Sequence, residues 1–84
     1  MDPSDMTQNN YYYFADHGSG VEVVKFDRVE SGNVYTFASM RPSTLSYSGP
    51  GLWGPTANTG DIRLATLSEI THLLLCIAAG VYVP

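Results

Sequence analysis

The clearest pattern of apolar and polar positions lies in the last third of the chain and predicts an α-helix at Leu67–Ala79. Four large apolar residues recur there at the spacing i, i+3, i+4 and i+7: Ile70, Leu73, Leu74 and Ile77. This spacing places their side chains on one face of a helix. We therefore expect that face to pack against the rest of the domain.

Both ends of this helix carry capping signals. Thr66 and Glu69 form the T-x-x-E pattern of a capping box, in which each side chain binds the backbone amide of the other residue. Gly80 supplies the left-handed conformation that commonly ends a helix. Pro84 cannot donate to a strand ladder, so residues 81–83 are expected to form only a short tail that packs on the core.

The helix is more apolar than one buried face requires. Leu67 and Ala78 widen the apolar stripe, and Leu75 falls on the polar side of the helix. One interpretation is that the domain's own sheet and loops cover nearly the whole helix. The other is that Leu75 belongs to an oligomer interface, most simply that of a homodimer, because a short chain gains stability readily from association.

Runs of β-branched and aromatic residues predict strands before the helix. They lie at residues 11–15, 21–29, 34–40 and 62–65. Residues 17–20 and 30–33 contain glycine and asparagine and are expected to form tight turns between the first three runs. These three strands then make an antiparallel meander, with the fourth run as a further strand.

Side-chain alternation is imperfect in the second run and regular in the third. Val21 and Val23 point to one side while Val24 and Phe26 point to the other, which predicts a bulge or burial on both faces. In the third run, one face is expected to carry Val34, Thr36, Ala38 and Met40, with Tyr35 and Phe37 on the opposite face.

The predicted fold is α+β, in one domain that spans residues 1–84: a small twisted antiparallel sheet of three or four strands with the helix packed across one face. An SH3-like, partly open barrel with a terminal helix is the alternative. Residues 1–10 are polar and expected to be flexible. Residues 41–60, rich in glycine, proline and serine, are expected to form a long irregular loop that presents Trp53.

Composition and charge narrow the classes of function. The 84 residues are 44% hydrophobic and 14% charged, which is typical of a folded chain. The formal net charge is −4 and no basic patch is present, so direct nucleic-acid binding is not expected. An acidic surface that mimics nucleic acid is a further option, although the carboxylates are few and scattered.

Three observations predict a cytoplasmic protein without a membrane anchor. Cys76 is the sole cysteine, so the chain forms no internal disulfide, and its acidic start does not resemble a signal peptide. The longest apolar run, residues 73–79, is far shorter than the roughly 20 residues that cross a membrane.

The candidate chemistry does not predict an enzyme. His72 and Cys76 lie four residues apart on the helix near Glu69, a spacing that suits two metal ligands or a Cys–His pair. A structural zinc site usually needs four ligands, and His17 is the only other histidine. We therefore expect no catalytic residue, no metal and no cofactor, and a half-buried cysteine with a surface histidine instead.

Recognition is the remaining class of function. Aromatic rings that can stack on a flat ligand or anchor a protein interface are Tyr12, Tyr47 and Trp53. Arg41 and Arg63 can bind a phosphate or a carboxylate through two N–H groups. The alternative is that Trp53 packs back onto the sheet and that Arg63 pairs with Asp61 or Glu69.

The tail at residues 63–84 carries a loose pattern of R-x-A-T, an acidic helix start, L-x-x-C-I and a terminal G-x-Y. It resembles the C-terminal ends of short accessory proteins of bacteriophages and mobile elements. The resemblance covers about a quarter of the chain. It implies a non-enzymatic inhibitor that binds a host defence factor directly in the host cytoplasm. Two alternatives are a sponge that sequesters a signalling nucleotide in an oligomer pocket, and a virion or assembly component.

Overall fold

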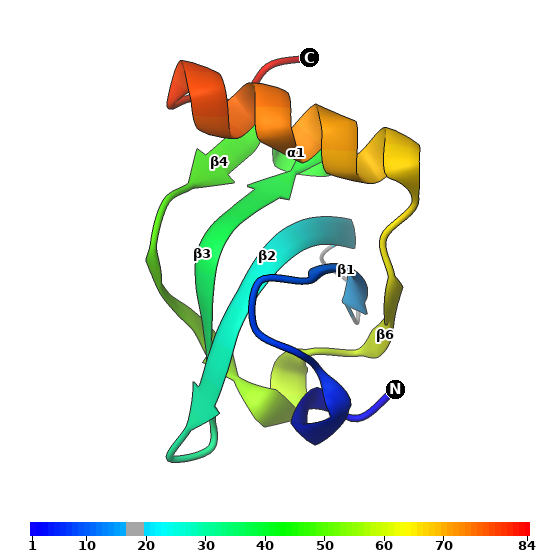
Figure 1. Ribbon diagram of the computed structural model, residues 1–84, viewed down its shortest axis with the longest axis vertical. Helices are drawn as coiled ribbons and strands as arrows, with labels where there is room; N and C mark the ends of the chain where they lie inside the picture. Colours follow the sequence, from blue (N-terminus) through cyan, green and yellow to red (C-terminus); the bar gives the residue numbers. More distant parts are fainter. Residues whose placement is uncertain (17–19) are drawn as a thin grey trace.

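The computed structural model describes residues 1–16 and 20–84 of the chain (Figure 1). The first predicted turn, at residues 17–20, lies outside the described residues except for its last position. The described part belongs to the α+β class, as the sequence predicts, with an antiparallel sheet and one C-terminal helix.

The sheet has six strands, so the expectation of three or four was wrong. The strands are β1 (Tyr11–Asp16), β2 (Gly20–Glu30), β3 (Asn33–Arg41), β4 (Ser46–Ser48), β5 (Gly51–Pro55) and β6 (Asp61–Leu64). The helix is α1 (Leu67–Ala79), and short 3-10 turns occur at η1 (Pro3–Asp5), η2 (Pro42–Thr44) and η3 (Thr56–Asn58). The bounds of α1 are those predicted from the sequence.

Strands β1, β2 and β3 form the predicted antiparallel meander, and β6 adds to the outer side of β1. Both β4 and β5 pair with β3: β4 with its end, at Ser39–Arg41, and β5 with its start, at residues 33–36. The interval 41–60 is therefore not a purely irregular loop. Its two strands pair through the backbone, and their sequence, broken by Gly49 and Pro50, shows no alternation of apolar side chains.

Strand β2 is buried on both faces, as its broken alternation predicts. Val24 and Phe26 lie in one apolar cluster, whereas Val23 lies in another cluster beneath α1. The register between β2 and β3 shifts on either side of Phe26, which confirms the predicted bulge. Val23 and Val24 are consecutive in a regularly paired stretch, so ordinary alternation directs them to the two apolar layers.

Strand β3 does not keep the single face that its sequence suggests. Val34 lies in the cluster with Phe26, whereas Ala38 and Met40 lie beneath α1. Phe26 pairs with Thr36 and its neighbour Lys25 pairs with Ala38, so the register skips the residue between them. The prediction of one shared face was wrong because this extra residue reverses the alternation.

The core therefore has two layers. The inner layer lies inside the curl of the sheet and consists of Met6, Tyr12, Phe14, Val24, Phe26, Val34 and Ile62, with Trp53 packed against it. The helix layer consists of Val23, Ala38, Met40, Leu73 and Cys76, with several partly buried residues around it. Figure 1 shows the curl of the strands, with α1 lying across one end of the sheet.

Helix α1 is capped as predicted but buries a slightly different face. Thr66 and Glu69 form both bonds of the capping box, and Gly80 ends the helix with φ 72°. The fully buried residues are Leu73 and Cys76, and Leu74 is 47% exposed, so its predicted burial was wrong. Ile70 and Ile77 are partly buried beside the two buried residues. No helix in the described part of the chain has the length and apolar character needed to cross a membrane.

Residues 1–10, which the sequence predicts to be flexible, are mostly exposed but make several contacts with the sheet. Met6 is buried in the inner layer. The backbone N–H of Thr7 donates to the Tyr12 hydroxyl at 2.8 Å, and that of Asn9 donates to the Phe26 carbonyl at 2.9 Å. These bonds hold residues 1–10 across the inner layer.

Candidate functional site

Two of the predicted binding residues, Arg41 and Trp53, converge on a third residue, Glu22, in a pocket of about 280 Å³. Glu22 comes from β2, Arg41 ends β3, and Trp53 lies on β5. We call this the Glu22 pocket. The pocket lies along β3. Strand β5 pairs with the start of β3 and β4 pairs with the end of β3, and both strands contribute to the lining.

The three side chains form a connected polar unit. Arg41 donates from Nε to Oε1 of Glu22 at 3.1 Å, and its Nη2 lies 3.0 Å from the same oxygen. The indole Nε1–H of Trp53 donates to Oε2 of Glu22. The Glu22 carboxylate is thus held from two sides, by a cation and by a neutral donor.

The alternation of β2 explains why a carboxylate lies here. Glu22 shares a face with Val24 and Phe26, which point into the inner layer, and it is 7% exposed. A buried carboxylate is costly unless it is paired and hydrogen-bonded. Arg41 and Trp53 satisfy both conditions, so the buried carboxylate is compensated at this end of the sheet.

Trp53 is fixed from a second direction by Phe14. The two rings meet edge to face, with centroids 5.0 Å apart. Because Phe14 belongs to β1, this contact spans the curl of the sheet from β5 to β1. The expectation that Trp53 packs back onto the sheet is confirmed, and its side chain also lines the pocket.

The rest of the pocket lining is mixed, with two glycines and the apolar side chains of Leu52 and Pro55 beside polar groups. It includes three hydroxyl side chains and one amide, from Thr36, Ser39, Ser48 and Asn58. Among the described residues that line the pocket, only Glu22 and Arg41 carry a charge. The formal charge of the lining is therefore zero.

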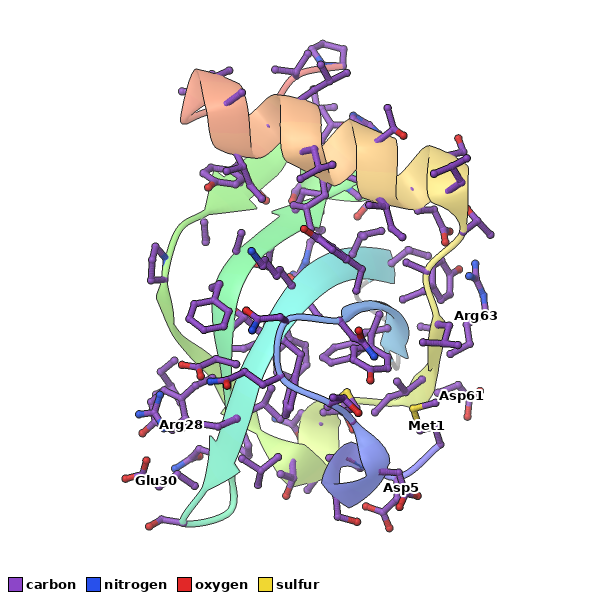
Figure 2. All side chains as sticks on the ribbon, in the orientation of Figure 1. Met1, Asp5, Arg28, Glu30, Asp61 and Arg63 are labelled. Atoms are coloured by element: carbon purple, nitrogen blue, oxygen red, sulfur yellow. The ribbon has the colours of Figure 1, made fainter. Side chains whose placement is uncertain are left out.

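The other predicted binding residues lie elsewhere. Tyr12 is 2% exposed in the inner layer, where its hydroxyl accepts the Thr7 bond. Tyr47 is partly buried against the helix layer. Arg63 points outward from β6 at the edge of the molecule (Figure 2). The five residues therefore do not form one site.

Arg63 has partners of its own. Its Nη1 and Nη2 donate to the two carboxylate oxygens of Glu69, each at 2.9 Å, and its guanidinium lies 3.7 Å from the centroid of the Tyr13 ring. Of the two alternatives for Arg63, pairing with Glu69 is confirmed. The hydrogen bonds from Arg63 lower the pKa of Glu69 to about 2.

The side of α1 that faces away from the sheet is the second candidate site. Its apolar residues are Leu67, Leu74 and Leu75, which are 80%, 47% and 53% exposed. Thr71 and Ala78 complete this side, and none of the five residues is charged. We call these five residues the outer leucine face. It includes Leu75, the predicted interface residue, and extends further than the sequence analysis suggested.

His72 and Cys76 hold the C-terminal tail instead of forming a site. Nε2 of His72 lies 2.5 Å from the carbonyl oxygen of Val83, and a carbonyl can only accept, so Nε2 donates. The backbone N–H of Val83 donates to Sγ of Cys76 at 3.3 Å, and Cys76 is completely buried rather than half-buried. No cluster of three or more possible metal ligands occurs among the described residues.

Glu22 is the functional candidate that the sequence analysis missed. The sequence does contain a signal for it. Glu22, Val24 and Phe26 are spaced two residues apart and therefore share one face of the strand, so burial of the two apolar residues predicts burial of the carboxylate. Its partners could not be identified from the sequence. Arg41 and Trp53 lie 19 and 31 residues further along the chain, so the contact depends on the tertiary fold.

Comparisons with known proteins add no relative. No family model, no curated protein sequence and no solved structure matches this chain.

Proposed function

We propose that this chain is a non-enzymatic, phage-type accessory protein that inhibits a host defence factor in the host cytoplasm by direct binding. The outer leucine face is the part that docks. The observation that carries the proposal is the exposure of Leu67, Leu74 and Leu75 on one charge-free side of α1. Single exposed leucines are ordinary, whereas a contiguous apolar face is typical of a protein interface.

The partner surface that fits this face is an apolar groove with a basic rim. An amphipathic helix commonly docks into such a groove through residues spaced i, i+4, i+7 and i+8, which here are Leu67, Thr71, Leu74 and Leu75. The chain carries a formal charge of −4, so a basic rim attracts it. A second copy carries the same net charge and offers no basic rim, which favours a different protein as the occupant.

The choice of a host defence factor as the target rests on the resemblance of residues 63–84 to phage and mobile-element proteins. The exposed apolar side of α1 supports the broader proposal that the chain binds a protein. Small-ligand sequestration is a second candidate function, and the convergence of Arg41 and Trp53 in the Glu22 pocket favours it.

The test uses host strains that each carry one defence system, challenged with a phage that the system restricts. We expect the intact protein to restore plaque formation in at least one strain. The double substitution Leu74→Asp and Leu75→Asp removes this effect, because buried apolar anchors each contribute about 2 kcal/mol to an interface. Leu45→Asp is the matched control, since Leu45 is 66% exposed and directly follows η2, away from α1 in the sequence.

Three results would overturn the proposal. The first is failure of the intact protein to restore plaques in any strain. The second is full activity of the Leu74→Asp, Leu75→Asp variant. The third is a dimer, seen by analytical ultracentrifugation of the protein alone, that dissociates on these two substitutions, because the outer leucine face then binds a second copy.

A further inference from the structure

The charge of the Glu22 pocket favours an uncharged ligand. Glu22 and Arg41 are the charged residues of the described lining, and they lie 3.0 Å apart as an ion pair. A strongly charged ligand would have to compete with that pair for Arg41. A neutral ligand leaves the pair in place, so binding it does not expose an unpaired buried carboxylate.

The volume of the pocket limits the ligand to about one ring. Ligand pockets commonly measure roughly 300–1,000 Å³, and the Glu22 pocket, at about 280 Å³, lies at the lower limit of this range. A dinucleotide is too large for it. A single sugar ring fills such a volume.

The lining offers many hydrogen bonds in a small space. Hydroxyl groups of Thr36, Ser39 and Ser48 can both donate and accept, and the amide of Asn58 can do both as well. Arg41 has five N–H donors, of which Nε and Nη2 serve Glu22. Its remaining N–H groups are available to hydroxyl oxygens of a ligand.

Trp53 supplies a rigid apolar surface in the same pocket. Its indole is held at Nε1 by Glu22 and at the ring by Phe14. A fixed aromatic ring next to polar groups matches a sugar ring, whose faces carry C–H groups and whose rim carries hydroxyls. Preorganised side chains lose little conformational entropy on binding.

We propose that the Glu22 pocket binds a sugar ring that carries adjacent hydroxyl groups. Arg41 donates to the ligand hydroxyls, Trp53 packs on the ring, and Glu22 is a positioning residue for both. The ring comes from a free monosaccharide or from the ribose of a nucleoside. None of the described residues that line the pocket belongs to α1, so the sugar site is separate from the outer leucine face. The two proposals can therefore be tested independently.

The chain contains one tryptophan, so its fluorescence reports directly on this pocket. The experiment titrates the intact protein with hexoses, pentoses, nucleosides and 2′,3′-dideoxynucleosides, and follows both Trp53 fluorescence and the heat of binding. Saturable binding of a hexose or pentose identifies a monosaccharide. Saturable binding of a nucleoside, lost in its dideoxy form, identifies the ribose.

Two arginine variants make the test specific. We expect Arg41→Lys to weaken binding by at least about tenfold, because lysine keeps the charge but loses the fork of N–H donors. Arg63→Lys is the matched control, since Arg63 pairs with Glu69 outside the pocket and its substitution leaves binding unchanged. Asn58→Ala provides a second pocket variant, with the same expected direction, if circular dichroism shows that Arg41→Lys does not fold.

Several results would overturn the assignment. One is the absence of heat and of a fluorescence change with every monosaccharide and nucleoside. Another is equal binding of a nucleoside and its dideoxy form. Unchanged affinity in the folded pocket variants, or a response to inorganic phosphate alone, would equally contradict a sugar site that uses Arg41.

Discussion

Arg63 and Glu69 join the end of β6 to the first turn of α1 through two hydrogen bonds of 2.9 Å. The same Glu69 carboxylate accepts the backbone N–H of Thr66 at 2.8 Å, which closes the capping box. One carboxylate therefore fixes both the start of the helix and its attachment to the sheet.

This arrangement makes stability depend on pH. The pKa of Glu69 falls from 4.5 to about 2 on folding, chiefly because of the hydrogen bonds from Arg63. A lowered folded-state pKa stabilises the fold above the unfolded value, and this contribution is lost as the pH falls from about 4.5 to about 2. We expect Glu69→Gln to lower the free energy of unfolding at pH 7 by about 0.5 kcal/mol, as for other solvent-screened ion pairs.

Urea unfolding of both proteins from pH 7 to pH 2 checks this prediction. The difference between them should shrink progressively as the pH falls below about 5. A difference that stays constant over the whole range would show that Glu69 acts without its charge.

Two leucines that lie two positions apart on α1 should differ sharply in their effect on stability. Leu73 is completely buried and Leu75 is 53% exposed. Leu73→Ala removes packed apolar volume and should cost about 2–5 kcal/mol. Leu75→Ala should change the free energy of unfolding by less than about 0.5 kcal/mol. Urea unfolding at low protein concentration measures both, and a large loss in Leu75→Ala would place that side chain in a stable assembly.

Removing Arg41 should be more damaging than removing both members of its ion pair. Arg41→Met leaves the Glu22 carboxylate buried without its cation, and we expect a loss of about 2–4 kcal/mol. The double variant Glu22→Leu, Arg41→Met should lose less than the single variant does. Thermal unfolding of the four proteins of this cycle gives the coupling. Strictly additive losses would contradict the ion pair.

The Cys76 thiol should be inert until the C-terminal tail is removed. Cys76 is completely buried and accepts the Val83 N–H, while His72 binds the Val83 carbonyl. We expect Ellman's reagent to react slowly with the intact protein and at least about tenfold faster with a chain that ends at Gly80, since exposure controls thiol reactivity. Equal rates for the two folded proteins would show that the tail does not cover the thiol.

Local signals in the sequence were sufficient for α1. Its capping box, its bounds and its Gly80 stop depend on contacts within a few residues, so pattern alone determines them. Which side of the helix is buried depends on the sheet beneath it, and this is why Leu74 was misassigned. Most positions of the tail pattern have structural roles: Arg63, Thr66 and Glu69 form the cap and ion pair, and Leu73 and Cys76 pack on the sheet.

The Glu22 pocket shows where sequence reasoning reached its limit. Aromatic and arginine side chains were recognisable as binding groups, and Arg41 and Trp53 do meet. Their meeting depends on β5 pairing with β3 through backbone bonds, which leaves no side-chain period in residues 41–60. The same absence of periodicity hid β4 and β5, so the pocket and the two strands were missed for one physical reason.

The inward position of Glu22 also disfavours an incorrect register of β2 in the sheet. If β2 slipped by one residue against its neighbours, every side chain would change face, and Glu22 would replace Val23 beneath α1. There it would lie among Leu73 and Cys76, on the opposite face of the sheet from the Glu22 pocket, as a charge in an apolar layer. Glu22 adds little to the stability of the correct sheet but destabilises the sheet with β2 shifted by one residue. It therefore helps to specify the correct pairing of the strands.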